Sequence, residues 1–177
     1  FFLMIRRPPR ATLLPYTTRF RSLLPGSLIL LGGNPGIGKS TLALQILPAF
    51  KKPVLYVSAE ESEEQIGLRA RRLNVNSDTL HLSSENRIEG ILDQVSLIQS
   101  ELVVIDSIQT VFSDALDSLP GSVSQIRECG QQLLQLAKQR NIAVIIIGHL
   151  TKEGVIAGPK MLRSEERRVG KECRSRW

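Results

Sequence analysis

The segment that most constrains the fold is residues 30–47, which read LLGGNPGIGKSTLALQIL. An apolar run ends in glycine, a glycine-rich turn follows, and a helical pattern begins at the lysine. Gly33 to Ser40 match the pattern G-x-x-x-x-G-K-[ST]. Glycines in such a turn let backbone N–H groups point at a phosphate, and the helix N-terminus adds about half a positive charge. The segment therefore predicts a strand, a phosphate-binding loop and a helix in succession.

This loop supplies the candidate nucleotide ligands. The Lys39 ammonium would reach the β- and γ-phosphates of ATP, the Ser40 hydroxyl would bind Mg²⁺, and Thr41 would touch the α-phosphate. The alternative is a chance glycine-rich turn, which the strand before it and the helix after it disfavour. The expected nucleotide-binding residues are Gly33, Asn34, Pro35, Gly36, Ile37, Gly38, Lys39, Ser40 and Thr41.

The rest of residues 23–162 alternates short apolar runs with helical patterns. Strands are expected at 27–33, 52–60, 79–84, 101–106 and 142–149, and helices at 40–48, 60–73, 86–100 and 122–140. In the last helix, Val123, Ile126, Cys129, Leu133 and Leu136 are expected on one face. Strands that alternate with helices predict an α/β fold, mainly a parallel sheet with helices on both faces.

Polar residues stand where three of these strands end, at the edge where α/β sheets bind ligands. Asp106 closes the run LVVID and is the expected Walker B carboxylate, holding Mg²⁺ together with Ser40. Glu60 is expected to be the catalytic base that orients the attacking water, with Glu61 as the second choice. Either glutamate could instead cap the following helix. His149 is expected to sense the γ-phosphate, or else to be a surface histidine.

Several other features of the sequence are interpreted as structural and not as parts of a catalytic or binding site. Arg69, Arg71 and Arg72 lie on one edge of the helix expected at 60–73 and are interpreted as a solvated face. Cys129 is expected in the core, and the two cysteines have no metal-ligand spacing. No apolar run is long enough to span a bilayer, so a cytoplasmic protein without a membrane partner is expected.

The net charge of +6 is unevenly distributed. Residues 1–22 carry five arginines and no acid, and residues 163–177 carry six basic and three acidic residues, whereas the middle is slightly acidic. Paired antiparallel, fourteen of the fifteen positions of 8–22 and 163–177 can be encoded by complementary codons. Both ends resemble a translated sequencing adapter. We therefore expect 1–22 and 163–177 to be non-native tails around a core at 23–162 that stops short on its C-terminal side.

Together these landmarks resemble the RecA-like P-loop ATPase core. Within it, "LYVSAEES", "VVIDSIQT", "PGSVSQIRE" and "GHLTKEGVIAGPKML" are similar to the RadA/Sms family of bacterial DNA-repair proteins, over essentially all of 23–162. The resemblance implies a hexameric, Mg-ATP-hydrolysing motor that acts on single-stranded and branched DNA and promotes branch migration, with a recombinase as a further partner. It also implies two DNA-facing loops, 113–121 and 151–159, with Lys152 and Lys160 as DNA contacts.

The resemblance is partial. Members of that family normally carry a four-cysteine zinc finger before the core, and a Lys-Asn-Arg-Phe-Gly motif and a Lon-protease-like domain after it. None of these occurs in this chain. Nucleotide binding is therefore expected of residues 23–162 themselves, whereas fast hydrolysis is expected to need a cation supplied in trans, for which the downstream region is a candidate source. The other readings left open are a non-catalytic nucleotide-binding switch and another RecA-like ATPase, such as a replicative-type helicase or a recombinase.

Overall fold

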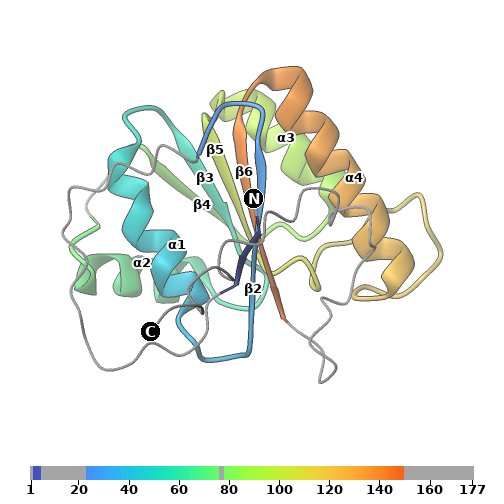
Figure 1. Cartoon of the computed structure of the whole chain (residues 1–177), viewed down its shortest axis with the longest axis horizontal. Coiled ribbons are helices and arrows are strands. Elements are labelled where there is room, and N and C mark those ends of the chain that lie inside the picture. Colours follow the sequence, from blue (N-terminus) through green and yellow to red (C-terminus); the bar gives the residue numbers. More distant parts are fainter. Residues whose placement is uncertain (1, 5–22, 76–77, 150–177) are drawn as a thin grey trace, which may run out of the picture.

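The computed structural model describes residues 2–4, 23–75 and 78–149. Among these residues six strands form one sheet, in which every adjacent pair is parallel (Figure 1). Their order is β1-β2-β6-β5-β3-β4. The strands are β1 (Phe2–Met4), β2 (Leu28–Gly33), β3 (Val54–Val57), β4 (Leu80–Ser83), β5 (Leu102–Asp106) and β6 (Ala143–His149). The predicted parallel α/β fold is confirmed.

Helices cover both faces of this sheet, as the sequence predicted. Figure 1 shows α1 and α2 on one face and α3 and α4 on the other. The helices are α1 (Lys39–Ile46), the short 3₁₀ helix η1 (Leu47–Ala49), α2 (Glu63–Arg72), α3 (Ile88–Ile98) and α4 (Val123–Arg140). Because successive side chains of a strand point to opposite faces, the sheet supplies two apolar cores, one beneath each helix pair. Both cores are well filled around β3, β5 and β6, whose apolar side chains are buried throughout.

Local signals explain where the helices begin and end. Ser62 and Gln65 form a reciprocal capping box at the start of α2, and the Ser122 hydroxyl accepts from the Gln125 N–H at the start of α4. The helix expected over 40–48 instead ends at Ile46, since Pro48 fits the first turn of η1 rather than a continuing α-helix. Of the apolar face predicted for α4, Ile126, Cys129, Leu133 and Leu136 are buried, whereas Val123, in the first turn of the helix, is 62% exposed.

Strand β1 was not predicted. Phe2–Met4 pair in parallel with Leu30–Gly32 of β2, at the far edge of the sheet from β4. An edge strand exposes unpaired N–H and C=O groups, and a short apolar segment can satisfy those of β2. The remaining residues of the two expected tails lie outside the described part of the chain.

The connection from β5 to α4 is anchored by one buried amide. Gln125 is fully buried, and its Oε1 accepts from the Ser113 N–H at 2.8 Å. Its Nε2 donates to the carbonyls of Ser113, Leu116 and Ser118 at 2.9–3.2 Å. The segment expected to face DNA at 113–121 is therefore fixed at its base, while Leu119 at its tip is 80% exposed.

Candidate functional site

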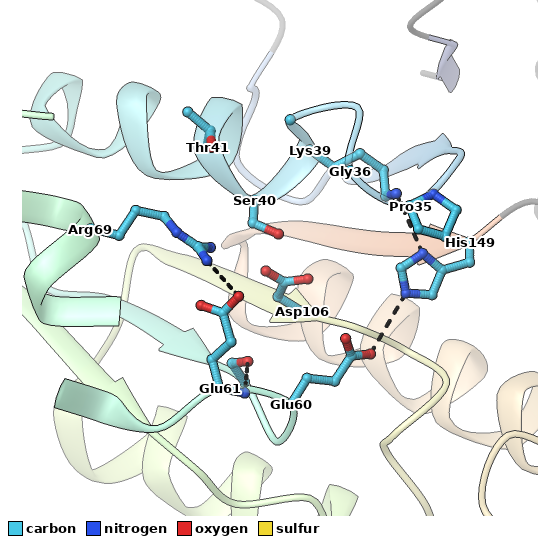
Figure 2. A pocket seen from close by; sticks show the side chains of 12 residues that line it. Pro35, Gly36, Lys39, Ser40, Thr41, Glu60, Glu61, Arg69, Asp106 and His149 are labelled. Carbon is cyan, nitrogen blue, oxygen red and sulfur yellow. Dashed lines mark hydrogen bonds and ion pairs between the residues drawn. The ribbon is translucent and has the colours of Figure 1, made fainter. Parts of the chain in front are cut away.

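A cavity of about 340 Å³ opens at the carboxyl ends of β2, β3, β5 and β6 (Figure 2). The parallel sheet brings this edge together, since residues that follow each of these strands meet there. The lining residues are Pro35, Gly36, Gly38, Lys39, Ser40, Thr41, Ser58, Glu60, Glu61, Arg69, Asp106 and His149. Every catalytic and metal-binding residue predicted from the sequence lies in this one cavity, whereas Gly33, Asn34 and Ile37 belong to the same loop without lining it.

The glycines of the loop have distinct structural roles. Gly36 and Gly38 adopt positive φ angles of 75° and 97°, a conformation that other residues rarely adopt. At Gly33 a Cβ atom would stand 3.2 Å from Ile37 Cγ2, so the loop closes tightly there. Within the described part of the chain no side chain caps α1, whose N-cap is Gly38. The N–H groups of its first turn are thus left to an anion, which the helix dipole also favours.

Lys39 is nearly buried and lies across the mouth of the loop. Its Nζ donates to the carbonyls of Gly33 and Asn34 at 2.8 and 2.9 Å, and lies 3.4 Å from His149 Nδ1. Burial lowers the pKa of the Lys39 ammonium, while the charges of Asp106 and Glu60 oppose this shift. Among the described residues the Lys39 ammonium therefore hydrogen-bonds neutral carbonyls and an imidazole ring, and charged phosphate oxygens would be stronger acceptors for it.

Asp106 and Ser40 fit a magnesium ion. Asp106 ends β5 with 9% of its surface exposed, and Tyr56 donates to its Oδ2 at 2.6 Å. Burial, and next the Asp106 charge, raise the pKa of the Tyr56 phenol, which therefore stays a donor. Among the described residues no group of three or more His, Cys, Asp and Glu could hold a metal by itself. One carboxylate and one hydroxyl suit Mg²⁺, which takes its other ligands from water and substrate phosphates.

The neighbouring glutamates point in different directions. Glu60 accepts a hydrogen bond from the Ser107 hydroxyl, and its Oε1 lies 3.7 Å from His149 Nε2. Glu61 instead forms an ion pair with Arg69. Figure 2 shows His149 on one side of Asp106 and the Arg69–Glu61 pair on the other. Glu60, the first choice for catalytic base, thus shares a chain of contacts with His149 and Lys39.

Three residues of the site were missed or misread in the sequence. Arg69 was assigned to a solvated helix edge, which is wrong for this residue but correct for the exposed Arg71 and Arg72. The sequence signal for its pairing with Glu61 is the spacing of eight residues, which is about two turns of a helix. Tyr56 and Ser107 gave none, because a buried tyrosine in an apolar strand and a serine after one are both common. Lys152 and Lys160 lie outside the described residues.

A sequence model of the AAA domain matches residues 6–155 of the chain. The chain belongs to the AAA domain family. The chain is also 50% identical over 143 residues to the DNA repair protein RadA of Listeria monocytogenes, and the match covers 79% of this chain and 31% of that protein. The RadA proteins of Bacillus subtilis and Streptococcus pneumoniae are also 50% identical, over 79% of this chain and 31% and 34% of their own. The resemblance to RadA/Sms proteins is confirmed, and the chain spans about a third of these relatives.

The fold has a counterpart among solved structures. A DnaB-like replicative helicase, described in terms of its interactions with primase, superposes with a TM-score of 0.61 at 14% identity, over 74% of this chain and 41% of that one. At this identity the likeness shows the fold alone, and it agrees with the predicted RecA-like P-loop ATPase core. No helix of the described residues is long and apolar enough to cross a membrane.

Proposed function

We propose that this chain is the ATPase core of a DNA-repair motor that hydrolyses Mg-ATP and acts on single-stranded and branched DNA. The observation that carries the proposal is the gathering of Lys39, Ser40, Asp106, Glu60 and His149 around one cavity beneath an uncapped helix N-terminus. The 50% identity to RadA proteins supports the DNA-repair role. Branch migration, a hexameric ring and a recombinase partner are parts of the same proposal.

In this mechanism the loop amides and Lys39 bind the phosphates, and Ser40 and Asp106 hold Mg²⁺. The ion neutralises charge on the β- and γ-phosphates when it is bound. Glu60 accepts the proton of the attacking water while the Ser107 hydroxyl holds its carboxylate in place. His149 contacts both Glu60 and Lys39. When the γ-phosphate replaces these contacts, the position of the His149 side chain at the end of β6 changes. Lys152 and Lys160 follow β6 in the sequence and are the proposed DNA contacts.

The test is the Glu60→Gln variant, which keeps the size of the side chain and removes its basicity. We expect ATP binding within about threefold of the parent and hydrolysis at least about 100-fold slower, since general base catalysis contributes about 10²–10⁴. Glu64→Gln, an exposed glutamate of α2, is the matched control and should hydrolyse ATP at the parent rate. Equal, measurable hydrolysis by Glu60→Gln and the parent would exclude Glu60 as the catalytic base. ATP binding without hydrolysis by either protein would favour a non-catalytic nucleotide-binding switch.

We also propose that the tails 1–22 and 163–177 are non-native, on the codon complementarity described above. Sequencing the source DNA outward from codons 23 and 162 tests this. Flanks that differ from both tails are expected. Genomic DNA that encodes the two tails would overturn the proposal and make their arginines candidate DNA contacts.

A further inference from the structure

Tyr56 is a buried residue that the proposed hydrolysis step does not use. Its side chain is 1% exposed and packs in the apolar core beneath α1 and α2. Its hydroxyl donates to Asp106 Oδ2 at 2.6 Å. A phenylalanine would fill the same space in the core without a polar group that needs a hydrogen-bond partner. The packing of the core therefore explains the ring of Tyr56 but not its hydroxyl.

The pairing of β3 with β5 directs this hydroxyl to the carboxylate. Tyr56 stands opposite Val104, and Asp106 is two residues further along β5. Because side chains two residues apart on a strand share a face, Tyr56 and Asp106 lie on the same face of the sheet. Every residue of both strands is buried. The contact is thus set by the register of two buried strands and not by the conformation of a loop.

The hydrogen bond from Tyr56 holds the Asp106 carboxylate without neutralising its charge. Asp106 is 9% exposed, and within the described part of the chain it belongs to no ion pair. A lysine or arginine bonded to Asp106 would compete with a metal ion for the carboxylate, whereas a phenol supplies a donor and no charge. Carboxylates that ligate metals are commonly oriented by such hydrogen bonds. The pair therefore has the chemistry of a metal ligand and its supporting donor.

The Asp106 carboxylate also faces the place where the ion is expected. Asp106 and Ser40 both line the cavity, and Tyr56 is not one of the described residues that line it. Figure 2 shows the Asp106 carboxylate turned toward the Ser40 hydroxyl. Since Oδ2 is bonded to a hydroxyl from the core, Oδ1 is the oxygen left for the cavity.

We propose that Tyr56 is the positioning residue of the metal site, whose hydroxyl holds Asp106 Oδ2 so that Oδ1 is presented to Mg²⁺, or to a water molecule on it, beside Ser40. The inference rests on the proposed function, because it needs a Mg-nucleotide in the cavity. It adds to that function a residue that acts on metal affinity through Asp106, from outside the cavity.

The test is a Mg²⁺ titration of the binding of a fluorescent, non-hydrolysable ATP analogue to the full chain. Tyr56→Phe deletes the hydroxyl and keeps the ring. We expect the Mg²⁺ concentration at half-saturation to rise about tenfold, the lower end of the effect of removing a partner of a metal ligand. Binding of the analogue without Mg²⁺ should stay unchanged. The double variant Tyr56→Phe/Asp106→Asn should shift no further than Asp106→Asn, because Tyr56 acts through Asp106.

A spectroscopic measurement tests the same contact with the Tyr56 hydroxyl in place. The chain has two tyrosines, Tyr16 and Tyr56. Incorporation of fluorotyrosine therefore gives two fluorine NMR signals, and the Tyr16→Phe variant identifies the signal of Tyr56. This signal should shift when Mg²⁺ is added to the analogue-bound protein, because the ion draws electron density from the carboxylate that accepts the hydrogen bond. A Tyr56 signal that does not respond to Mg²⁺ would contradict the inference even if Tyr56→Phe failed to fold.

Ser100→Ala is the matched control for the titration. It removes a buried hydroxyl that lies just before the opposite end of β5, and it should keep the parent's Mg²⁺ dependence. An unchanged Mg²⁺ half-saturation in Tyr56→Phe would overturn the inference, as would a further shift in the double variant. So would an equal loss of binding with and without Mg²⁺, which would mean that Tyr56 acts on the fold alone. If the parent bound no Mg-nucleotide at all, the proposed function itself would fail.

Discussion

The replacement of Gln125 by alanine tests how the connection between β5 and α4 is held. Gln125 Oε1 accepts one backbone N–H, and the two hydrogens of its Nε2 are shared among three carbonyls. The side chain thus makes about three hydrogen-bond equivalents, each worth about 1 kcal/mol net. Because Gln125 and Ser113 are both fully buried, the groups left behind cannot all reach water. We expect Gln125→Ala to lower the free energy of unfolding by about 3 kcal/mol.

The assay is urea unfolding followed by circular dichroism, with thermal unfolding as a second measure. A loss of about 3 kcal/mol corresponds to a melting temperature lower by about 6–12 °C for a chain of this size. The control is Gln131→Ala, which makes the same substitution at an exposed position of the same helix and should change stability by less than about 0.5 kcal/mol. Equal stability of Gln125→Ala and Gln131→Ala would refute the view that this amide anchors the connection.

Two further predictions concern the core. Leu44→Ala, at a fully buried position of α1, should cost about 2–5 kcal/mol in urea unfolding, whereas Leu97→Ala, at a side chain 85% exposed, should cost less than about 0.5 kcal/mol. Burial raises the pKa of the Cys129 thiol from 9.0 to about 12. Above pH 9 the unfolded chain therefore loses a proton that the folded chain keeps, so stability should fall as pH rises toward 12. Cys129→Ala should show a shallower fall, and equal slopes would contradict the assignment.

Much of the fold follows from local patterns in the sequence. The buried strands are apolar runs bounded by turns, and the G-x-x-x-x-G-K-S loop fixes how β2 joins α1. Because the strands are parallel, Glu60, Asp106 and His149 lie at one edge of the sheet whatever the order of the strands is. This is why the sequence alone could predict that these residues lie together at one edge of the sheet.

The contacts that orient these side chains could not be predicted, because they depend on which strands are neighbours. Ser107 reaches Glu60 only because β3 and β5 are adjacent, with Val57 in register with Ile105. The same adjacency brings Tyr56 to Asp106. Strand β1 escaped prediction for a related reason, since three residues of pairing carry no periodic signal of their own.

The central claim, that this cavity binds the phosphates of a nucleotide, is tested most directly by titrating a fluorescent ATP analogue into the chain and its Lys39→Ala variant in the presence of Mg²⁺. Lys51→Ala, at an exposed lysine after η1, serves as the control. A charge-assisted hydrogen bond to phosphate is worth about 1.5–3 kcal/mol, so Lys39→Ala should bind about 10–150-fold more weakly while Lys51→Ala binds as the parent does. Equal affinities for the parent and Lys39→Ala would contradict the claim.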